Sequence, residues 1–381
     1  MAQTNTKRTI SPFRADIVGS FLRPTSLKEA REKFAKGEIT AEDLRQVEDT
    51  EIIHLINQQV EAGLKAVTDG EFRRSWWHLD FLWGLNGVEK KILNRGRAFF
   101  NMETRPESAQ LVGELSGENH PFVDHFKFTI KHTPKGIEAR QSIPAPAQLF
   151  NILNTPNNIE ATRAIYKNDE DLIEAIAQAY AQVLQDLYEA GAKTVQFDDT
   201  TWGYLCEPLP EDLSQDELTK EIEKRKKDTK NQLTVNNRTI DLKPKELNIT
   251  THICRGNYRS SWTSQGPYDA VSTPLFDKEN VNAYYLEFDS ERAGGFQPLE
   301  KVSDDKLVVL GLITSKTGEL EDRTSVISRI KEASQYIPLD RLALSTQCGF
   351  ASTEEGNELT QEQQWAKIGL VTSIAKEVWG E

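Results

Sequence analysis

Short apolar runs alternate along the chain with longer stretches of helical periodicity. The short runs are rich in β-branched residues and end in polar clusters, which is typical of buried strands. Eight of them occur, at residues 14–18, 65–67, 139–143, 193–197, 247–251, 283–286, 306–310 and 341–344. Eight strand–helix units in 381 residues predict the fold class α/β, in the form of a (β/α)8 TIM barrel.

The helical stretches are bounded by end signals. The first covers residues 26–62 and is interrupted, with a new N-cap at Thr40 and an acidic partner, Asp43, three residues later. A long amphipathic helix is expected at about residues 169–190, and a last helix at about residues 360–378.

Two segments depart from this alternation. Residues 97–134 alternate apolar and polar positions around turn signals, which predicts a hairpin-like insertion before the third strand. Residues 207–244 are rich in charge and predict a solvated helical insertion after the fourth strand. We expect a single barrel domain over residues 13–381, preceded by a flexible N-terminal arm at residues 1–12.

The chain is acidic, with 59 Asp and Glu against 46 Lys and Arg and a net charge of −13. Nucleic-acid-binding domains usually present a basic face, so no nucleic-acid partner is expected. No apolar run approaches the roughly 18 residues that span a bilayer, and residues 1–12 lack the apolar core of a secretory signal. A cytoplasmic protein without a membrane partner is therefore the expectation.

The three cysteines, Cys206, Cys254 and Cys348, are too sparse for a disulfide framework. Cys254 lies two residues after His252, so both side chains point to the same face of a strand. Cys348 follows the eighth predicted strand, and the carboxyl ends of barrel strands meet at one mouth. Thiolate and imidazole ligands favour zinc, whereas a lone cysteine more often serves as a small buried apolar residue. The position of these side chains at strand ends favours the metal site.

Six clusters at strand ends resemble, in their order along the chain, the motifs of a known family. They are Ile17-Val18-Gly19-Ser20-Phe21, Asp69-Gly70-Glu71, Val195-Gln196-Phe197-Asp198-Asp199, His252-Ile253-Cys254, Leu286-Glu287 and Gln347-Cys348-Gly349. The chain resembles the catalytic half of cobalamin-independent methionine synthase, in its short single-barrel branch. Proteins of this family transfer a methyl group from a folate to the thiol of homocysteine, giving methionine.

The resemblance implies a zinc-dependent S-methyltransferase with Zn2+ as its cofactor. His252, Cys254, Glu287 and Cys348 would bind the metal. The partners it implies are homocysteine or a similar small thiol and, as a candidate methyl donor, a methyl-folate. The thiol would take the place of Glu287 and bind as a thiolate, because zinc lowers the pKa of a bound thiol.

The resemblance also implies four substrate-binding residues. Glu71 and Asp198 would hold the ammonium of homocysteine, and Ser20 with the backbone of Gly19 would hold its carboxylate. Taken without the family, Asp198 is explained more readily by a turn after a strand, and Glu71 by a solvated side chain.

Two motifs depart from the family pattern. After the seventh strand the family has a His that assists proton transfer to the leaving group, whereas here Thr314 precedes Ser315 and Lys316. An amine leaves readily only when it is protonated. Ser315 and Lys316 are therefore the expected catalytic residues, with Lys316 or water replacing the acid, unless the methyl donor differs. After the fourth strand, Asp198-Asp199 stands where the family usually has Asp-Glu-Pro.

Three functions stay open. The first is S-methylation of homocysteine. The second is alkylation of another thiol, such as coenzyme M, although Glu71 and Asp198 favour an amino-acid thiol. The third is a non-catalytic zinc- or thiol-binding homologue, which Thr314 favours. Four aromatic residues could stack a pterin or belong to the core: Phe72, Trp76, Trp77 and Trp83.

Overall fold

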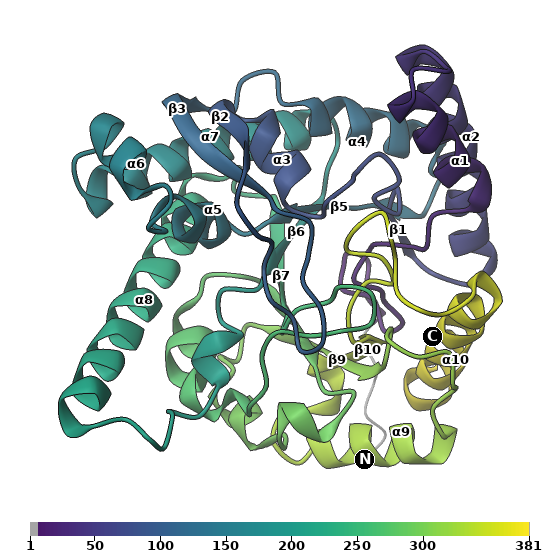
Figure 1. The fold of residues 1–381 in the computed structure, drawn as a ribbon. Helices are drawn as coiled ribbons and strands as arrows, with labels where there is room; N and C mark the ends of the chain where they lie inside the picture. The colour runs from purple at the N-terminus through teal and green to yellow at the C-terminus, as the bar shows by residue number, and fades with distance from the viewer. Residues whose placement is uncertain (1–6, 381) are drawn as a thin grey trace.

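A closed barrel of parallel strands lies at the centre of the structure, a computed structural model that describes residues 7–380 (Figure 1). Six strands form one parallel sheet in the order β10-β9-β8-β7-β6-β5. Their bounds are β5 Gln141–Pro144, β6 Thr194–Asp199, β7 Asn248–Ile253, β8 Ala283–Glu287, β9 Leu307–Ile313 and β10 Leu342–Thr346. The strands are almost wholly buried because side chains cover both of their faces, as expected of a parallel barrel sheet.

Two short segments close the barrel between β5 and β10. β1 (Ala66–Val67) pairs in parallel with β4 (Glu138–Ala139), which continues into β5. Residues 14–18 make a single parallel bridge, from Ala15 to Leu344 of β10. Phe21 then donates a backbone hydrogen bond to Gly70, just beyond β1. The predicted TIM barrel is thus confirmed, although its first expected strand is reduced to one bridge.

Helices surround the strands (Figure 1). The α-helices are α1 Thr25–Ala35, α2 Ala41–Glu61, α3 Leu79–Gly84, α4 Pro121–His132, α5 Pro146–Leu153, α6 Ile159–Ile165, α7 Asp169–Glu189, α8 Gln215–Leu242, α9 Arg323–Ala333 and α10 Gln361–Trp379. The capping box that the sequence predicts at Thr40 and Asp43 is present at the start of α2. Around β8 only short helical turns occur: η2 Tyr268–Ala270, η3 Thr273–Asp277, η4 Glu291–Ala293 and η5 Gln297–Lys301.

The insertion before the third strand is a hairpin, as predicted, but its expected bounds were wrong. Its strands are β2 (Asn86–Ile92) and β3 (Glu107–Ser116), which pair antiparallel. The region after β3 is not part of the hairpin, because Pro121 occupies the first turn of α4 and His120 caps that helix. The long loop between β2 and β3 crosses in front of the barrel strands in Figure 1.

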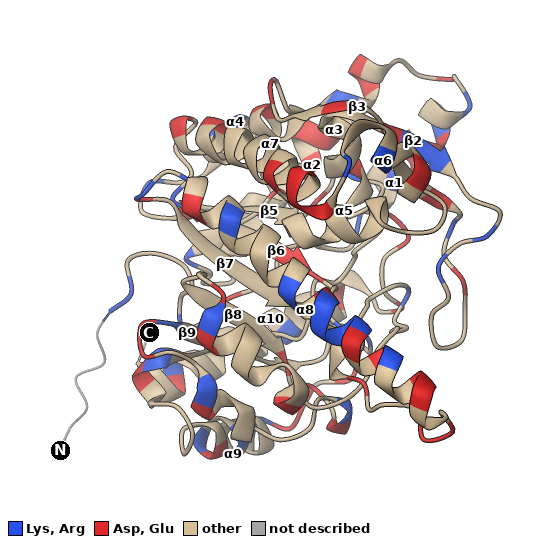
Figure 2. Ribbon diagram, turned by 90° about the vertical axis from the view of Figure 1, so that its left-hand side faces the viewer, with Lys and Arg blue, Asp and Glu red and all other residues tan. Residues whose placement is uncertain are grey.

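The charged segment after the fourth strand, residues 207–244, contains the helix α8, as predicted. The buried side chains of this helix all lie between residues 232 and 240, where it packs on α5 and α7. Its first half carries many charged side chains and projects from the barrel (Figure 2). No helix among residues 7–380 is long and apolar enough to cross a membrane.

The expected N-terminal arm is described only in part, since residues 1–6 lie outside the described residues. Arg8 donates hydrogen bonds to the backbone carbonyls of Asp340 and Leu342. Ser11 is buried, and its backbone N–H donates to the carboxylate of Glu138 at 3.0 Å.

A buried ion pair lies between residues 14–18 and the segment that joins β4 to β5. Arg140 donates to the Asp16 carboxylate at 2.7 Å and to the Tyr285 hydroxyl at 2.6 Å. The side chains of Arg140 and Asp16 are each 1% exposed. Removal of one partner would leave an uncompensated charge in the barrel.

We expect Arg140→Met to lower the free energy of unfolding by about 3–5 kcal/mol, because Asp16 loses its counter-ion. Denaturant unfolding followed by circular dichroism measures this loss. The control is Arg238→Gln, which breaks an exposed pair with Glu174 and should change stability little. Equal losses in the two variants would contradict the role given to the buried pair.

Candidate metal and substrate site

Four potential ligand atoms converge at the carboxyl ends of three barrel strands. His252 lies near the end of β7, Cys254 directly after β7, Glu287 at the end of β8, and Cys348 shortly after β10. Their ligand atoms all lie within 4.8 Å of one another, and all four residues are buried. The structure therefore brings together the whole set of metal ligands expected from the sequence.

The His252 ring is oriented for a metal. Its Nδ1 lies 3.2 Å from the backbone carbonyl oxygen of Tyr285, so this nitrogen carries the proton and donates it. The other nitrogen, Nε2, is buried and has no hydrogen-bond partner within residues 7–380. A hydrogen bond from one ring nitrogen to a carbonyl, with the other nitrogen directed at the ion, is the usual arrangement of a ligating histidine.

The two thiols face each other without a disulfide. The Sγ atoms of Cys254 and Cys348 are 3.7 Å apart. The hydrogen bond with Cys348, followed by burial, raises the pKa of the Cys254 thiol well above its usual range. A cation held by these residues would displace this proton and offset the charge, because thiols ligate metals as thiolates. Two thiolates, one imidazole and one carboxylate suit a tetrahedral site for zinc.

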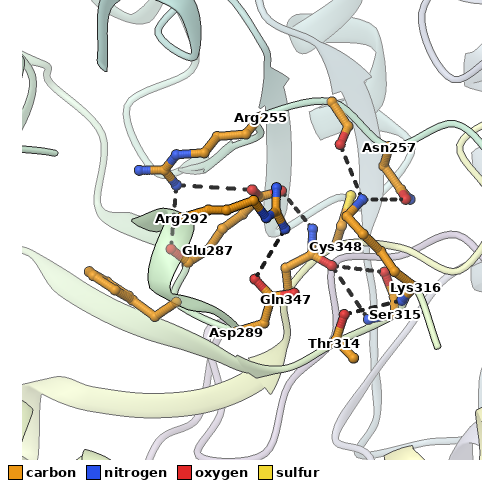
Figure 3. Close-up of polar contacts among 12 residues, drawn as sticks. Arg255, Asn257, Glu287, Asp289, Arg292, Thr314, Ser315, Lys316, Gln347 and Cys348 are labelled. Atoms are coloured by element: carbon orange, nitrogen blue, oxygen red, sulfur yellow. Dashed lines mark hydrogen bonds and ion pairs between the residues drawn. The ribbon is translucent and has the colours of Figure 1, made fainter. Parts of the chain in front are cut away.

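Glu287 is held from two sides. Gln347 Nε2 donates to Glu287 Oε1 at 2.7 Å, and Arg255 Nη1 lies 4.0 Å from Glu287 Oε2 (Figure 3). Ser315 Oγ in turn donates to Gln347 Oε1 at 3.1 Å, which fixes the orientation of that amide. Gln347 and Arg255 were not predicted as site residues, although each directly neighbours a cysteine ligand in the sequence. They place a hydrogen bond and a positive charge next to the carboxylate ligand.

Ser315 and Lys316, the two residues expected to be catalytic, do not line the cavity that lies beside the metal ligands. Ser315 contacts the site only through Gln347. The Lys316 ammonium donates to the backbone carbonyls of Gly256 and Ser261 at 3.2 Å and to Asn257 Oδ1 at 2.9 Å (Figure 3). Neither side chain is among those that line the cavity. Lys316 would have to leave three oxygen acceptors to reach reacting atoms.

A cavity of about 420 Å³ opens beside the metal ligands. His252, Cys254 and Cys348 line it, together with the predicted substrate residues Ser20, Glu71 and Asp198. Two of the four aromatic candidates, Trp76 and Trp77, also line the cavity. The other two do not: Phe72 belongs to an apolar cluster under α2, and Trp83 packs against the core and donates to the Ser108 carbonyl.

Glu71 is a strained and buried carboxylate. Its φ of 63° lies in the left-handed region, which residues other than glycine rarely adopt. Ser142 Oγ donates to Glu71 Oε1 at 3.1 Å, and Arg74 lies 3.3 Å from the same oxygen. Burial, with the nearby Asp198 charge, outweighs Arg74 and raises the pKa of Glu71 to about 7. Glu71 Oε2 has no hydrogen-bond partner within the described residues.

Asp198 is the second acid of the cavity. It is buried, Gln196 donates to its Oδ1 at 2.8 Å, and burial raises its pKa. The neighbouring Asp199 points elsewhere, because it accepts from Thr201 and Asn236 in a fully buried turn. Only the first carboxylate of the pair faces the cavity.

Ser20 lies where the chain after residues 14–18 approaches the loop after β10. Its Oγ accepts a hydrogen bond from the backbone N–H of Ala351 at 3.2 Å. A Cβ at Gly349 would lie only 1.9 Å from this Oγ, so the close approach requires glycine at that position. Gly19 has a φ of 144° and directs its carbonyl to the Thr68 hydroxyl at 2.6 Å.

The fold and the site define a TIM-barrel protein with a His-Cys-Glu-Cys candidate metal centre beside an acidic cavity. The family described as "Cobalamin-independent synthase, Catalytic domain" matches residues 13–367. The chain therefore belongs to the cobalamin-independent methionine synthase family, and this membership indicates a methyltransferase that acts on small molecules.

Relatives match nearly the full length of the chain. The uncharacterized protein YxjH of Bacillus subtilis is 44% identical over 382 residues, which cover 99% of this chain and 97% of YxjH. A methionine synthase of Saccharolobus solfataricus is 22% identical and covers 88% of this chain and 87% of its own length.

Two solved structures are similar to the barrel. A Listeria monocytogenes protein proposed to be a vitamin-B12-independent methionine synthase is 36% identical, with a TM-score of 0.74 over 98% of this chain and 100% of that one. A B12-independent methionine synthase of Shewanella sp. W3-18-1, in complex with selenomethionine, is 20% identical, with a TM-score of 0.70 over 96% and 97%. The second likeness is one of fold.

We expect Cys348→Ala to abolish stoichiometric metal binding, because the site loses a thiolate ligand while the barrel strands keep their contacts. Metal content by elemental analysis and unfolding curves measure the two effects. Cys206→Ala is the matched control, since Cys206 is buried like Cys348 but lies outside the cluster. Full metal retention in Cys348→Ala would show that the ligand set is wrong.

Proposed function

We propose that this protein is a zinc-dependent methyltransferase that methylates the thiol of homocysteine and forms methionine. The observation that carries the proposal is one cavity that is lined by three residues of the four-ligand cluster and by two buried acids, Glu71 and Asp198. A ligand with a thiol at one end and an ammonium at the other fits this pair of features. The same acids disfavour a sulfonate thiol such as coenzyme M, because they would repel its negative group.

His252, Cys254, Glu287 and Cys348 would hold the metal. Zinc bound there would lower the pKa of a substrate thiol and supply a thiolate nucleophile at neutral pH. Gln347 and Arg255 keep the Glu287 carboxylate hydrogen-bonded and charge-compensated. They can therefore stabilise this carboxylate when it is not a ligand, which suits a position that a substrate thiol takes over.

Glu71 and Asp198 would bind the substrate ammonium, and Ser20 with the Gly19 backbone would bind its carboxylate. Glu71 Oε2 gives the ammonium an acceptor that no group within residues 7–380 already uses. The selenomethionine in the Shewanella structure supports an amino acid of this size as a ligand of the fold.

Methyl transfer from a tertiary amine needs a proton donor near the leaving group. Thr314 stands at the family's histidine position, and its backbone N–H donates to Glu321 at 2.8 Å. Lys316 stays the predicted replacement, and a water molecule in the cavity is the alternative. We propose a methyl-folate as the donor on the family resemblance, with Trp76 and Trp77 as aromatic walls of its site.

Formation of methionine from homocysteine and a methyl-folate by the zinc-loaded protein tests the proposal directly. We expect Asp198→Asn to raise the KM for homocysteine at least about tenfold, because the ammonium loses one of the two carboxylates that bind it. Zinc should stay bound. Asp212→Asn, at an exposed acid on another part of the chain, makes the same charge change and should have no effect. An unchanged KM in Asp198→Asn would exclude the proposed ammonium site.

Amino-acid binding should depend on pH through Glu71. The pKa of this group is about 7 in the free protein, so the carboxylate that attracts an ammonium is lost as the pH falls below 7. We expect the Kd of L-methionine, which has no thiol proton to lose, to rise as the pH falls from 8 to 6. Titration calorimetry measures this profile, and Glu71→Gln should weaken binding and flatten it. A profile that is equally steep in Glu71→Gln would assign the pH dependence to another group.

A further inference from the structure

The sheet alone does not fix the distance between the two cysteine ligands. Cys254 follows β7 and Cys348 follows β10, and β8 and β9 lie between these strands. The backbone N–H of Cys254 donates to Asp199 of β6 at 2.9 Å. That of Gln347, which precedes Cys348, donates to Ile313 of β9 at 2.7 Å. The sheet thus brings two loops to one mouth, and contacts between these loops then set the separation of the two sulfur atoms.

One buried amide joins the two loops. Asn257 lies three residues after Cys254 and is 6% exposed. Its Nδ2 donates to the backbone carbonyl of Gly349, the residue after Cys348, at 2.8 Å and to Ser352 Oγ at 3.0 Å. The amide therefore links the chain segments that hold both cysteines.

A buried ammonium holds the other side of this amide. Asn257 Oδ1 accepts from Lys316 Nζ and from Asn357 Nδ2, each at 2.9 Å (Figure 3). Lys316 also donates to the carbonyls of Gly256 and Ser261, which belong to the same loop as Asn257. The orientation of the amide is thus determined, since its oxygen faces two donors and its nitrogen faces two acceptors. Asn257 lines the cavity, but its hydrogen-bonding positions are all engaged within the protein.

Gly349 is confined from a second side. A Cβ at this position would lie 1.9 Å from Ser20 Oγ, and the backbone N–H of the next residue, Phe350, donates to the Ser20 carbonyl at 3.0 Å. The segment of Cys348 therefore lies between Ser20 and the amide of Asn257. Only the amide belongs to the loop that carries Cys254, so its loss would let the two cysteines shift relative to each other.

We propose that Asn257 is a positioning residue of the metal centre, whose amide sets the separation of the two cysteine ligands while Lys316 holds the amide in place. The inference rests on the proposed function, because it needs a metal at the cluster, and it adds a residue that is not itself a ligand. Ligands that are held at the required separation before the ion binds lose less freedom on binding it. Asn257 thus acts on the affinity for zinc and on the geometry of the centre.

The test is the affinity of the full chain for zinc, measured by competition with a chelator in Asn257→Asp. This variant keeps the size of the side chain and its acceptor for Lys316, but an oxygen replaces the Nδ2 donor and repels the Gly349 carbonyl. We expect the Kd for zinc to rise at least about tenfold, the usual cost of losing a supporting hydrogen bond of a metal site. The added negative charge would by itself tighten zinc binding, so charge cannot cause the loss.

The absorption spectrum of the cobalt-substituted protein is the second readout. Its bands depend on the arrangement of the thiolates around the metal, and we expect them to differ between Asn257→Asp and the wild-type protein. Asn86→Asp is the matched control, because it makes the same change at an exposed amide that donates to the Glu118 carbonyl. It should leave the Kd and the spectrum unchanged.

Unfolding of the zinc-free variants shows whether each one folds. If Asn257→Asp does not fold, Lys316→Met provides a second variant, since it removes the ammonium from Asn257 Oδ1 and should also raise the Kd for zinc. Loss of a proton donor alone would lower the rate of methyl transfer without a change in this Kd.

Unchanged zinc affinity and an unchanged cobalt spectrum in folded Asn257→Asp would overturn the inference. An equal loss of zinc affinity in Asn86→Asp would overturn it too. A wild-type protein that binds zinc but does not methylate homocysteine would contradict the proposed function alone. A wild-type protein that binds no zinc would contradict both.

Discussion

Closure of the parallel barrel is the constraint on which the site depends. The ligand atoms of His252, Cys254, Glu287 and Cys348 come from positions up to 96 residues apart in the sequence, yet lie within 4.8 Å of one another. This proximity exists because β7, β8, β9 and β10 are adjacent in register and end at one mouth. A shift of one strand by one residue would turn its ligand to the opposite face.

A buried cluster of two thiols, one imidazole and one carboxylate is costly to leave without a cation. The unpartnered Nε2 of His252 and the two facing sulfur atoms show the same need. The surrounding structure is built to orient these groups: the Tyr285 carbonyl sets the His252 tautomer, and the chain from Ser315 through Gln347 sets the Glu287 carboxylate. The polar network around the ligands thus determines how His252 and Glu287 are oriented.

The sequence predicts the barrel and three of the four ligands from local rules, whereas Glu287 was expected from the family resemblance. Apolar runs that end in polar residues identify the strand ends, and the barrel geometry then places His252, Cys254 and Cys348 together. The hairpin bounds were missed because β2 carries exposed charges and buries only Val88, so its alternation is weak. The buried place of Lys316 depends on three oxygen acceptors that only the folded chain provides.

The cavity combines groups with opposite preferences. Glu71 and Asp198 make one side acidic, and the thiols and the imidazole of the candidate metal site line the cavity beside them. Such a distribution suits a ligand that carries both an ammonium and a thiol. The central claim is that the cluster is a zinc centre that binds a substrate thiol. Zinc-edge X-ray absorption of the purified protein, with and without L-homocysteine, tests it most directly. The account predicts one zinc per chain with two sulfur ligands that gains a third on addition of homocysteine. A zinc centre whose sulfur coordination ignores homocysteine, or a protein that binds no zinc, would contradict it.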